Sequence, residues 1–229
     1  MNNRQFLTDD KEYPPNRLRH RTVTTQVLSA TDPDTIPAVS AAIRRNELII
    51  LPTDTVYGVG TNAFDEEAIR CLFVAKQRTR KKGIPILLAD VPDLEKVAMD
   101  IPPVAKNLIA RFWPGPLTLV LPKRPDLPPA LSSSGNVAVR IPDHNVSREI
   151  IRAAGGALAV TSANLSGHAP AQTVSEALDE LAGAVTVAVD NGRSRGQLAS
   201  TVVDCTGDTI RILRTGPLPM EELLQVERE

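Results

Sequence analysis

Residues 48–60 read Leu-Ile-Ile-Leu-Pro-Thr-Asp-Thr-Val-Tyr-Gly-Val-Gly, an apolar run followed by polar residues and two glycines. The four apolar residues at its start are typical of a buried strand, and Pro52 ends the strand because proline has no N–H to donate. Gly58 and Gly60 then allow backbone angles that other residues resist, so main-chain N–H groups can approach a ligand closely. Three hydroxyl side chains add to these donors: those of Thr53, Thr55 and Tyr57. The stretch therefore predicts either a site loop after a buried strand or a plain connecting loop rich in turn formers.

The composition fits one large soluble domain with an aliphatic core. Of the 229 residues, 42% are hydrophobic and only 3% are aromatic. The chain has 26 basic and 27 acidic residues, a net charge of -1, so no overall field attracts it to nucleic acid or to a membrane. Any such partner would need a local patch of charge.

Cysteine and histidine usage predicts a cytoplasmic protein without a metal site. Cys71 and Cys205 are far apart, and the sequence shows neither a signal peptide nor a long apolar span, so we expect a reducing compartment and no membrane. Cys71 lies among apolar residues and is expected to pack in the core. The three histidines, His20, His144 and His168, are too scattered to form a metal site.

The pattern of helical and strand-like segments predicts an α/β fold. We expect residues 1–22 to be a flexible polar tail and residues 23–229 to form a single domain. Expected helices cover residues 32–46, 65–75 with Asp65 as N-cap, 92–98, 102–112, 146–154, 174–181 and 219–226. Expected strands cover residues 48–51, 84–88, 117–121, 137–141, 157–160, 185–189, 201–204 and 209–213. The alternation is too irregular for a doubly wound sheet, so the prediction is a twisted mixed sheet flanked by helices.

Two sequence matches to known motifs fail on their context. Residues 58–63 satisfy the dinucleotide pattern G-x-G-x-x-A, but the glycines come too late after the strand, and Arg80 stands where an acid should hold the ribose. Residues 192–196 match the G-x-S-x-G nucleophile elbow, but strand-like sequence follows and every histidine precedes Ser194. The sequence also has no P-loop, so any nucleotide is held by other means.

A basic cluster marks the end of the expected helix 65–75. Five cations fall within seven residues, where the negative end of the helix dipole favours positive charge. These are Lys76, Arg78, Arg80, Lys81 and Lys82. Such a run is either a solvated helix end or a site for a polyanion, because Lys and Arg both bind phosphate oxygens well.

A second cation interrupts an expected strand. Arg140 lies within the apolar run 137–141, where an unpaired cation would be costly to bury. It is therefore expected to contact a ligand or, as a close alternative, an internal Asp or Glu.

Other polar residues stand beside the expected strands. Thr118 follows a stiff Trp-Pro-Gly-Pro corner, and residues 161–167 place hydroxyl and amide groups directly after strand 157–160. Ser200 opens one strand and Arg214 closes another. Together they offer many donors and cations but few carboxylates and no general-base histidine. This combination suits an anionic substrate with several phosphates.

Seven spaced motifs, taken together, resemble the Sua5/YciO/YrdC family over roughly residues 30 to 220. They are Pro52-Thr-Asp-Thr-Val-Tyr-Gly58, Lys76-x-Arg78, Trp113-Pro-Gly-Pro-Leu-Thr118, Val139-Arg-Ile-Pro142, Ser162-Ala-Asn-Leu-Ser-Gly167, Ser200-Thr-Val-Val-Asp204 and Ile212-Leu-Arg214. The resemblance implies a YrdC-like domain whose mixed sheet surrounds a concave, positively charged cavity. It also implies an L-threonylcarbamoyladenylate synthase, which forms threonylcarbamoyl-AMP and pyrophosphate from L-threonine, bicarbonate and ATP with Mg²⁺. This nucleotidyl transfer begins the t6A modification of tRNA, so tRNA or proteins of that pathway are the implied partners.

The same resemblance implies roles for nine residues. Lys76 and Arg78 correspond to the catalytic pair that grips the ATP phosphates and the carboxy intermediate, and Thr55 to the hydroxyl that contacts threonine. The remaining nucleotide contacts correspond to Thr118, Ser162, Asn164 and Arg214. Arg140 and Ser200 correspond to residues bordering the threonine and phosphate sites. One departure leaves the floor of the amino-acid site open: many relatives have a histidine after the strand that follows the Lys-x-Arg pair, and this chain has none there.

Two alternative functions remain open at this level. The same basic cavity could bind tRNA or double-stranded RNA without chemistry, although few aromatic residues and a net charge near zero count against it. A paralogue within the family could use another carbamoyl donor.

Overall fold

The computed structural model describes residues 23–79, 82–196 and 198–228. The expected tail over residues 1–22 lies outside these ranges, as do Arg80 and Lys81 of the basic cluster.

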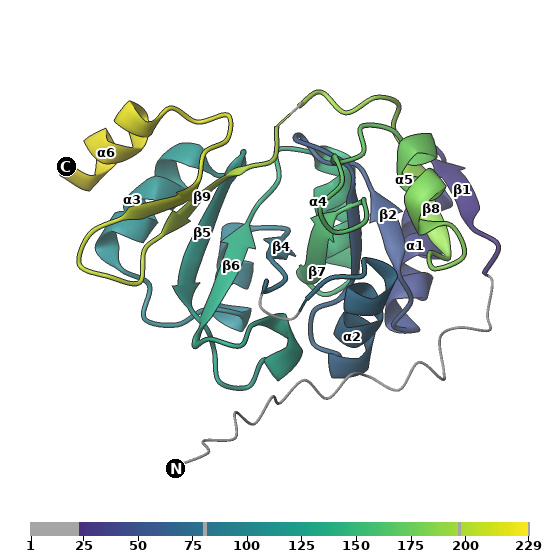
Figure 1. The fold of residues 1–229 in the computed structure, drawn as a ribbon, viewed down its shortest axis with the longest axis horizontal. Coiled ribbons are helices and arrows are strands. Elements are labelled where there is room, and N and C mark those ends of the chain that lie inside the picture. Colours follow the sequence, from purple (N-terminus) through teal and green to yellow (C-terminus); the bar gives the residue numbers. More distant parts are fainter. Residues whose placement is uncertain (1–22, 80–81, 197, 229) are drawn as a thin grey trace, which may run out of the picture.

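A mixed sheet of ten strands runs through the described part of the chain, in the order β1-β8-β2-β3-β7-β4-β6-β5-β9-β10 (Figure 1). The strands are β1 (Gln26–Ser29), β2 (Ile49–Leu51), β3 (Gly58–Asn62), β4 (Ile86–Leu88), β5 (Leu117–Pro122), β6 (Asn136–Arg140), β7 (Ala157–Ser162), β8 (Val187–Asp190), β9 (Thr201–Asp204) and β10 (Arg211–Arg214). The sheet contains parallel pairs such as β2–β8 and β5–β9 and antiparallel pairs such as β2–β3 and β5–β6. The predicted mixed sheet is confirmed, with β1 as an additional edge strand.

Six α-helices flank the sheet within the described residues. They are α1 (Thr35–Arg44), α2 (Glu66–Ala75), α3 (Pro103–Phe112), α4 (Asn145–Ala153), α5 (Val174–Leu181) and α6 (Met220–Arg228), with short 3-10 helices at Val91–Lys96 and Pro129–Leu131. The predicted N-cap is confirmed, because the Asp65 carboxylate accepts the Ala68 N–H at 2.7 Å. The first expected short helix, over residues 92–98, is the 3-10 turn Val91–Lys96.

The apolar run at the start of residues 48–60 is continuous because both faces of β2 are covered. Leu48 and Ile50 belong to the larger hydrophobic cluster, whereas Ile49 and Leu51 belong to a second cluster with side chains of α1 and α4. Successive side chains of a strand point to opposite faces. A strand buried on both sides therefore needs no polar alternation.

Helices cover the two faces of the sheet unequally. The larger cluster packs side chains of α2, α3, α5 and α6 against one face. The smaller cluster packs α1 and α4 against the other, over β8, β2, β7 and β4. Among the described helices, none contributes to this second face over β6, β5 and β9, and this is the part of the sheet where the candidate site lies.

The two glycines of residues 48–60 were expected to bring main-chain N–H groups close to a ligand, but they have a different role. Gly58 and Gly60 are not loop residues, because they belong to β3, which pairs with β7. A Cβ atom on either would lie 2.7 Å from the side chain of Val160. These positions are glycine because Val160 of the neighbouring strand fills the space. The loop between β2 and β3, whose residues 53–57 are here called the site loop, therefore ends at Tyr57.

Candidate functional site

A cavity of about 220 Å³ lies where the second face of the sheet is uncovered. Its floor is built from residues two apart on single strands, such as Ala138 and Arg140 on β6 and Val160 and Ser162 on β7. Side chains at such positions share one face of a strand. The sheet therefore brings polar ends of strands far apart in the sequence around one hollow.

Seven of the nine predicted site residues line this cavity. They are Thr55, Arg78, Thr118, Arg140, Ser162, Ser200 and Arg214. The other two, Lys76 and Asn164, are not among its lining residues. Of the described residues that line it, none is Asp or Glu, and three are arginines.

Arg140 is buried and has an internal partner as well as a face on the cavity. Its side chain is 6% exposed, and Nη2 lies 2.5 Å from Oδ1 of Asp54. Nη1 donates to Oγ1 of Thr55 at 2.9 Å, and Nε donates to the Gly115 carbonyl at 2.9 Å. The alternative of an internal carboxylate is therefore correct, and Asp54 is a site residue that the sequence reasoning missed. The signal was its place between two threonines of the site loop.

The hydroxyl of Thr55 has a defined orientation. Thr53 uses its one hydroxyl hydrogen on the Val56 carbonyl, 2.6 Å away, so the 3.0 Å contact between the two threonine hydroxyls is donated by Thr55. Because Thr55 also accepts from Arg140, its hydroxyl keeps one free lone pair. It can accept a hydrogen bond from a ligand without losing either existing bond.

Three strands meet at a second polar group of the cavity. Thr118 of β5 and Ser200, which precedes β9, share a hydrogen bond of 2.7 Å between their hydroxyls. Arg214 of β10 donates from Nε to the Ser200 carbonyl at 3.0 Å and from Nη2 to its hydroxyl at 3.1 Å. This group fixes the position of the Arg214 guanidinium.

The arginines of the cavity repel one another. Arg78 donates to the carbonyls of Lys82 and Gly83, at 3.0 and 2.8 Å. Burial lowers its pKa, and the charge of Arg214 lowers it further. The charge of Arg214 also lowers the pKa of Arg140, after the larger effect of burial. An anion in the cavity would relieve this repulsion, since like charges at close range destabilise each other in a low dielectric.

Lys76 lies behind the cavity. It is 1% exposed, and its ammonium donates to the carbonyl oxygens of Ser162, at 2.5 Å, and of Asn164. Burial, followed by the charge of Arg78, lowers its pKa to about 8. The Lys76 carbonyl also accepts the Ser166 N–H at 2.9 Å. Lys76 therefore holds the loop after β7 by both side chain and main chain, and its implied contact with ATP phosphates stays a prediction.

Asn164 belongs to the same loop and faces inward. Its Nδ2 donates to the carbonyls of Leu165 and His168, at 2.7 and 2.9 Å. Its Oδ1 is buried and has no hydrogen-bond partner among the described residues. The implied nucleotide contact of Asn164 stays a prediction too.

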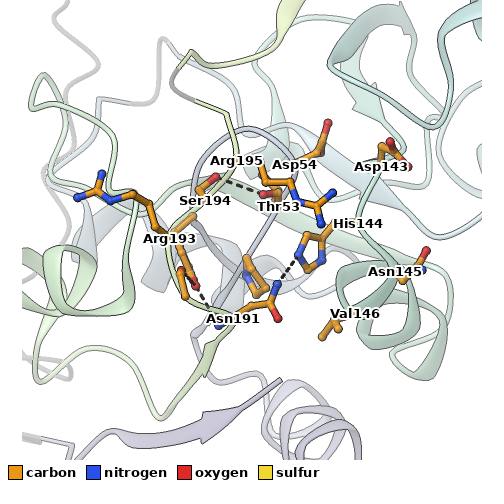
Figure 2. A pocket seen from close by; sticks show the side chains of 13 residues that line it. Thr53, Asp54, Asp143, His144, Asn145, Val146, Asn191, Arg193, Ser194 and Arg195 are labelled. Atoms are coloured by element: carbon orange, nitrogen blue, oxygen red, sulfur yellow. Dashed lines mark hydrogen bonds between the residues drawn. The ribbon is translucent and has the colours of Figure 1, made fainter. Parts of the chain in front are cut away.

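A second cavity, of about 400 Å³, lies on the other side of the site loop (Figure 2). Thr53 and Tyr57 line both cavities, which places the site loop between them. The rest of its wall comes from the N-terminus of α4 and from residues 191–195.

In the parts of the chain that the structure describes, no three His, Cys, Asp or Glu side chains come together as a metal site would need. No helix there has both the length and the apolar character needed to cross a bilayer.

Fold and site together define an α/β protein with a mixed sheet and an arginine-lined cavity between the sheet and its loops. A family model described as "Telomere recombination" and named for Sua5, YciO and YrdC matches residues 41–216. The chain belongs to the Sua5/YciO/YrdC family.

Relatives and solved structures agree with this placement. A putative threonylcarbamoyl-AMP synthase of Mycobacterium tuberculosis is 39% identical over 207 residues, which cover 88% of this chain and 95% of the relative. The threonylcarbamoyl-AMP synthase of Pyrococcus abyssi is 39% identical over 185 residues, 80% of this chain but only 54% of the relative. The structure of P. abyssi Sua5 complexed with L-threonine matches with a TM-score of 0.85 at 36% identity, covering 88% of this chain and 61% of that one. The structure of Escherichia coli YciO matches with a TM-score of 0.78 at 22% identity, 88% of this chain and 99% of that one, and supports the fold alone.

Proposed function

We propose that this protein is an L-threonylcarbamoyladenylate synthase, which makes threonylcarbamoyl-AMP and pyrophosphate from L-threonine, bicarbonate and ATP. The observation that carries the proposal is the convergence of three arginines and seven hydroxyl side chains on one cavity without a carboxylate among its described lining residues. The names of the relatives support it, and so does the P. abyssi relative whose structure contains L-threonine.

The proposed reaction needs charge neutralisation and positioning more than a protein nucleophile. The threonine amine and bicarbonate form a carbamate with loss of water, one carbamate oxygen attacks the α-phosphorus of ATP, and pyrophosphate leaves. Arg78 and Arg214 would neutralise charge on the phosphates, since guanidinium groups bind phosphate oxygens bidentately. One of the Thr118 and Ser200 hydroxyls would donate a hydrogen bond beside them, since the bond between the two uses the hydrogen of the other. The threonine moiety would bind beside Arg140 and Thr55, which share a hydrogen bond.

Mg²⁺ would enter this site as part of Mg·ATP. The described lining residues offer hydroxyl oxygens but no carboxylate, and Mg²⁺ commonly keeps several water ligands and binds substrate phosphates. The residues present therefore fit an ion carried by the phosphate oxygens and water, where it would reduce the negative charge of the triphosphate.

The product would serve the t6A modification of tRNA, which makes tRNA or proteins of that pathway the proposed macromolecular partners. A protein that only binds RNA would leave ATP intact. A paralogue with another carbamoyl donor would release pyrophosphate without L-threonine or without bicarbonate.

An omission assay separates these functions. The full-length protein is incubated with Mg·ATP, L-threonine and bicarbonate, and pyrophosphate and the adenylate are measured. Pyrophosphate release that stops when either L-threonine or bicarbonate is left out is the expected result. Pyrophosphate release when carbamoyl phosphate or another amine replaces bicarbonate or L-threonine would show that the protein is a paralogue with another substrate. Binding of tRNA with no release under any condition would refute the synthase.

A further inference from the structure

Residues 191–196, here called the strap, cross the back of the site loop, residues 53–57. Ser194 is the central contact: its hydroxyl lies 2.8 Å from the Thr55 carbonyl and 3.3 Å from the Thr53 carbonyl, the second contact being drawn in Figure 2. The main-chain N–H of Ser194 donates to the Gln172 carbonyl at 2.8 Å. Ser194 therefore ties the site loop to a fixed part of the chain before α5.

Tyr57 holds the first end of the strap. Its hydroxyl donates to the Gly192 carbonyl at 2.6 Å and accepts the Asn191 N–H at 3.0 Å. The Tyr57 residue itself is 0% exposed, and both bonds are partly buried. The strap and the site loop are thus joined at two points.

Gly196 sets how closely the strap approaches at its other end. A Cβ atom there would lie 2.6 Å from both Cα and the carbonyl oxygen of Thr55, and 2.7 Å from the carbonyl oxygen of Asp54. All three are backbone atoms, which cannot turn aside as a flexible side chain can. The main chains of the strap and the site loop are therefore in direct contact behind Thr55.

The strap borders the second cavity on its outer side (Figure 2). Asn191 reaches across it to His144, with Nδ2 and Nε2 3.1 Å apart. Open space lies there, and the strap is held by hydrogen bonds, both to the site loop and to Gln172, Glu176 and His144.

We propose that the strap positions the threonine end of the active site, with Ser194 as the positioning residue that fixes Thr55 for its contacts with Arg140 and the substrate. The inference rests on the proposed function, because it assigns Thr55 to the amino-acid end of that site. It also explains the G-x-S-x-G pattern without a nucleophile: the serine hydroxyl is directed at carbonyl oxygens of the neighbouring loop, and the second glycine permits the contact behind it.

The test compares Ser194→Ala and Ser194→Thr in the full-length protein, with Arg195→Ala as the matched control. Arg195 is the next residue of the strap, is exposed, and lines the second cavity rather than the first. Two quantities are measured: the KM for L-threonine in pyrophosphate release, and amide hydrogen exchange of residues 53–57 without ligand. Loss of one partly buried hydrogen bond predicts that Ser194→Ala raises the KM about three- to tenfold with little change in kcat. Exchange over residues 53–57 should become faster.

Further outcomes decide the proposal. Ser194→Thr should restore slow exchange and a low KM, because it keeps the hydroxyl, and Arg195→Ala should match the wild type in both. Gly196→Ala should also raise the KM and speed exchange over residues 53–57, because the added Cβ would displace the site loop while Ser194 is unchanged. Unchanged exchange and KM in Ser194→Ala, or equal effects of Arg195→Ala, would overturn the positioning role. If the wild type releases no pyrophosphate, the proposed function fails, and the exchange measurement alone still decides whether the strap holds the loop.

Discussion

The Nη1 atom of Arg140 lies 2.9 Å from the hydroxyl oxygen of Thr55, although 85 residues separate the two in the sequence. This bond joins the last residue of β6 to the site loop after β2. It turns the Thr55 hydroxyl so that one acceptor lone pair remains for a ligand, as the hydrogen-bond directions around Thr53 require. The bond is the structural core of the proposed amino-acid site.

Replacing Thr55 tests that bond. Thr55→Val keeps the shape but removes the lone pair that the hydroxyl offers to the substrate, and it leaves a buried N–H of Arg140 without an acceptor. Loss of such a hydrogen bond typically costs about 1–3 kcal/mol. We expect the KM for L-threonine to rise by roughly 10- to 100-fold, while Thr55→Ser stays close to the wild type. Steady-state pyrophosphate release at varied L-threonine measures both. Equal behaviour of the Val and Ser variants would remove the hydroxyl from substrate binding.

Asp54→Asn tests the ion pair behind Thr55. The Asp54 and Arg140 side chains are 14% and 6% exposed, with 2.5 Å between Oδ1 and Nη2. Removing one charge of a buried pair leaves the other uncompensated, so the free energy of unfolding should fall by about 3 kcal/mol. Urea denaturation followed by circular dichroism gives the value.

A matched control for this substitution is Asp126→Asn. Asp126 pairs with Arg124 at 3.0 Å, but both side chains are largely exposed, at 65% and 42%. Exposed pairs contribute little because water screens them, so stability should not change. A loss of similar size in both variants would mean that burial of the Asp54 pair is not the cause.

The sequence predicted the members of this site better than their geometry. Apart from Lys76-x-Arg78, which follows α2, each motif lies at a strand end or in a loop beside a strand, and the alternation of helices and strands predicted the mixed sheet that brings those ends together. The direction in which a side chain points at the end of an element depends on tertiary packing. For that reason Lys76, placed among the phosphate-binding residues by its motif, was not expected to be buried against two carbonyl groups.

The misplaced elements have local causes. Gly58 and Gly60 were taken for loop residues because glycine usually marks a turn, whereas here the bulk of Val160 on β7 explains them. Strand β1 was missed because three of its four residues are exposed, as suits an edge strand, so no apolar alternation marks it. The bond from Ser194 to the site loop spans 139 residues, a separation that no local pattern encodes.

Arg78 and Lys76 should differ sharply when each is replaced by alanine. Arg78 lines the cavity and faces the charge of Arg214, so Arg78→Ala should lower kcat/KM by on the order of 10²–10³ with the fold intact, as removal of one preorganised donor does. It should also reduce the increase in Tm that inorganic pyrophosphate gives the wild type. Lys76→Ala should instead loosen the loop after β7, which thermal unfolding would detect without any ligand. If Arg78→Ala retained wild-type turnover, Arg78 would not bind the phosphates.

The pH dependence of stability offers the most direct test of where Lys76 points. Burial lowers its pKa in the folded protein from 10.5 to about 8, so between these pH values the unfolded chain binds a proton that the folded protein does not. Stability attributable to Lys76 therefore rises with pH through this window, by up to about 1.4 kcal/mol per pH unit, and falls again as the pH returns to 8. Urea denaturation of wild type and Lys76→Met at pH 7.5, 8.5 and 9.5 measures the effect, since subtracting the two curves removes the titration of all other groups. The wild type should gain stability relative to the variant as the pH increases. Parallel curves would show that the ammonium keeps an ordinary pKa, and would place it in water or in the cavity rather than against the carbonyls of Ser162 and Asn164.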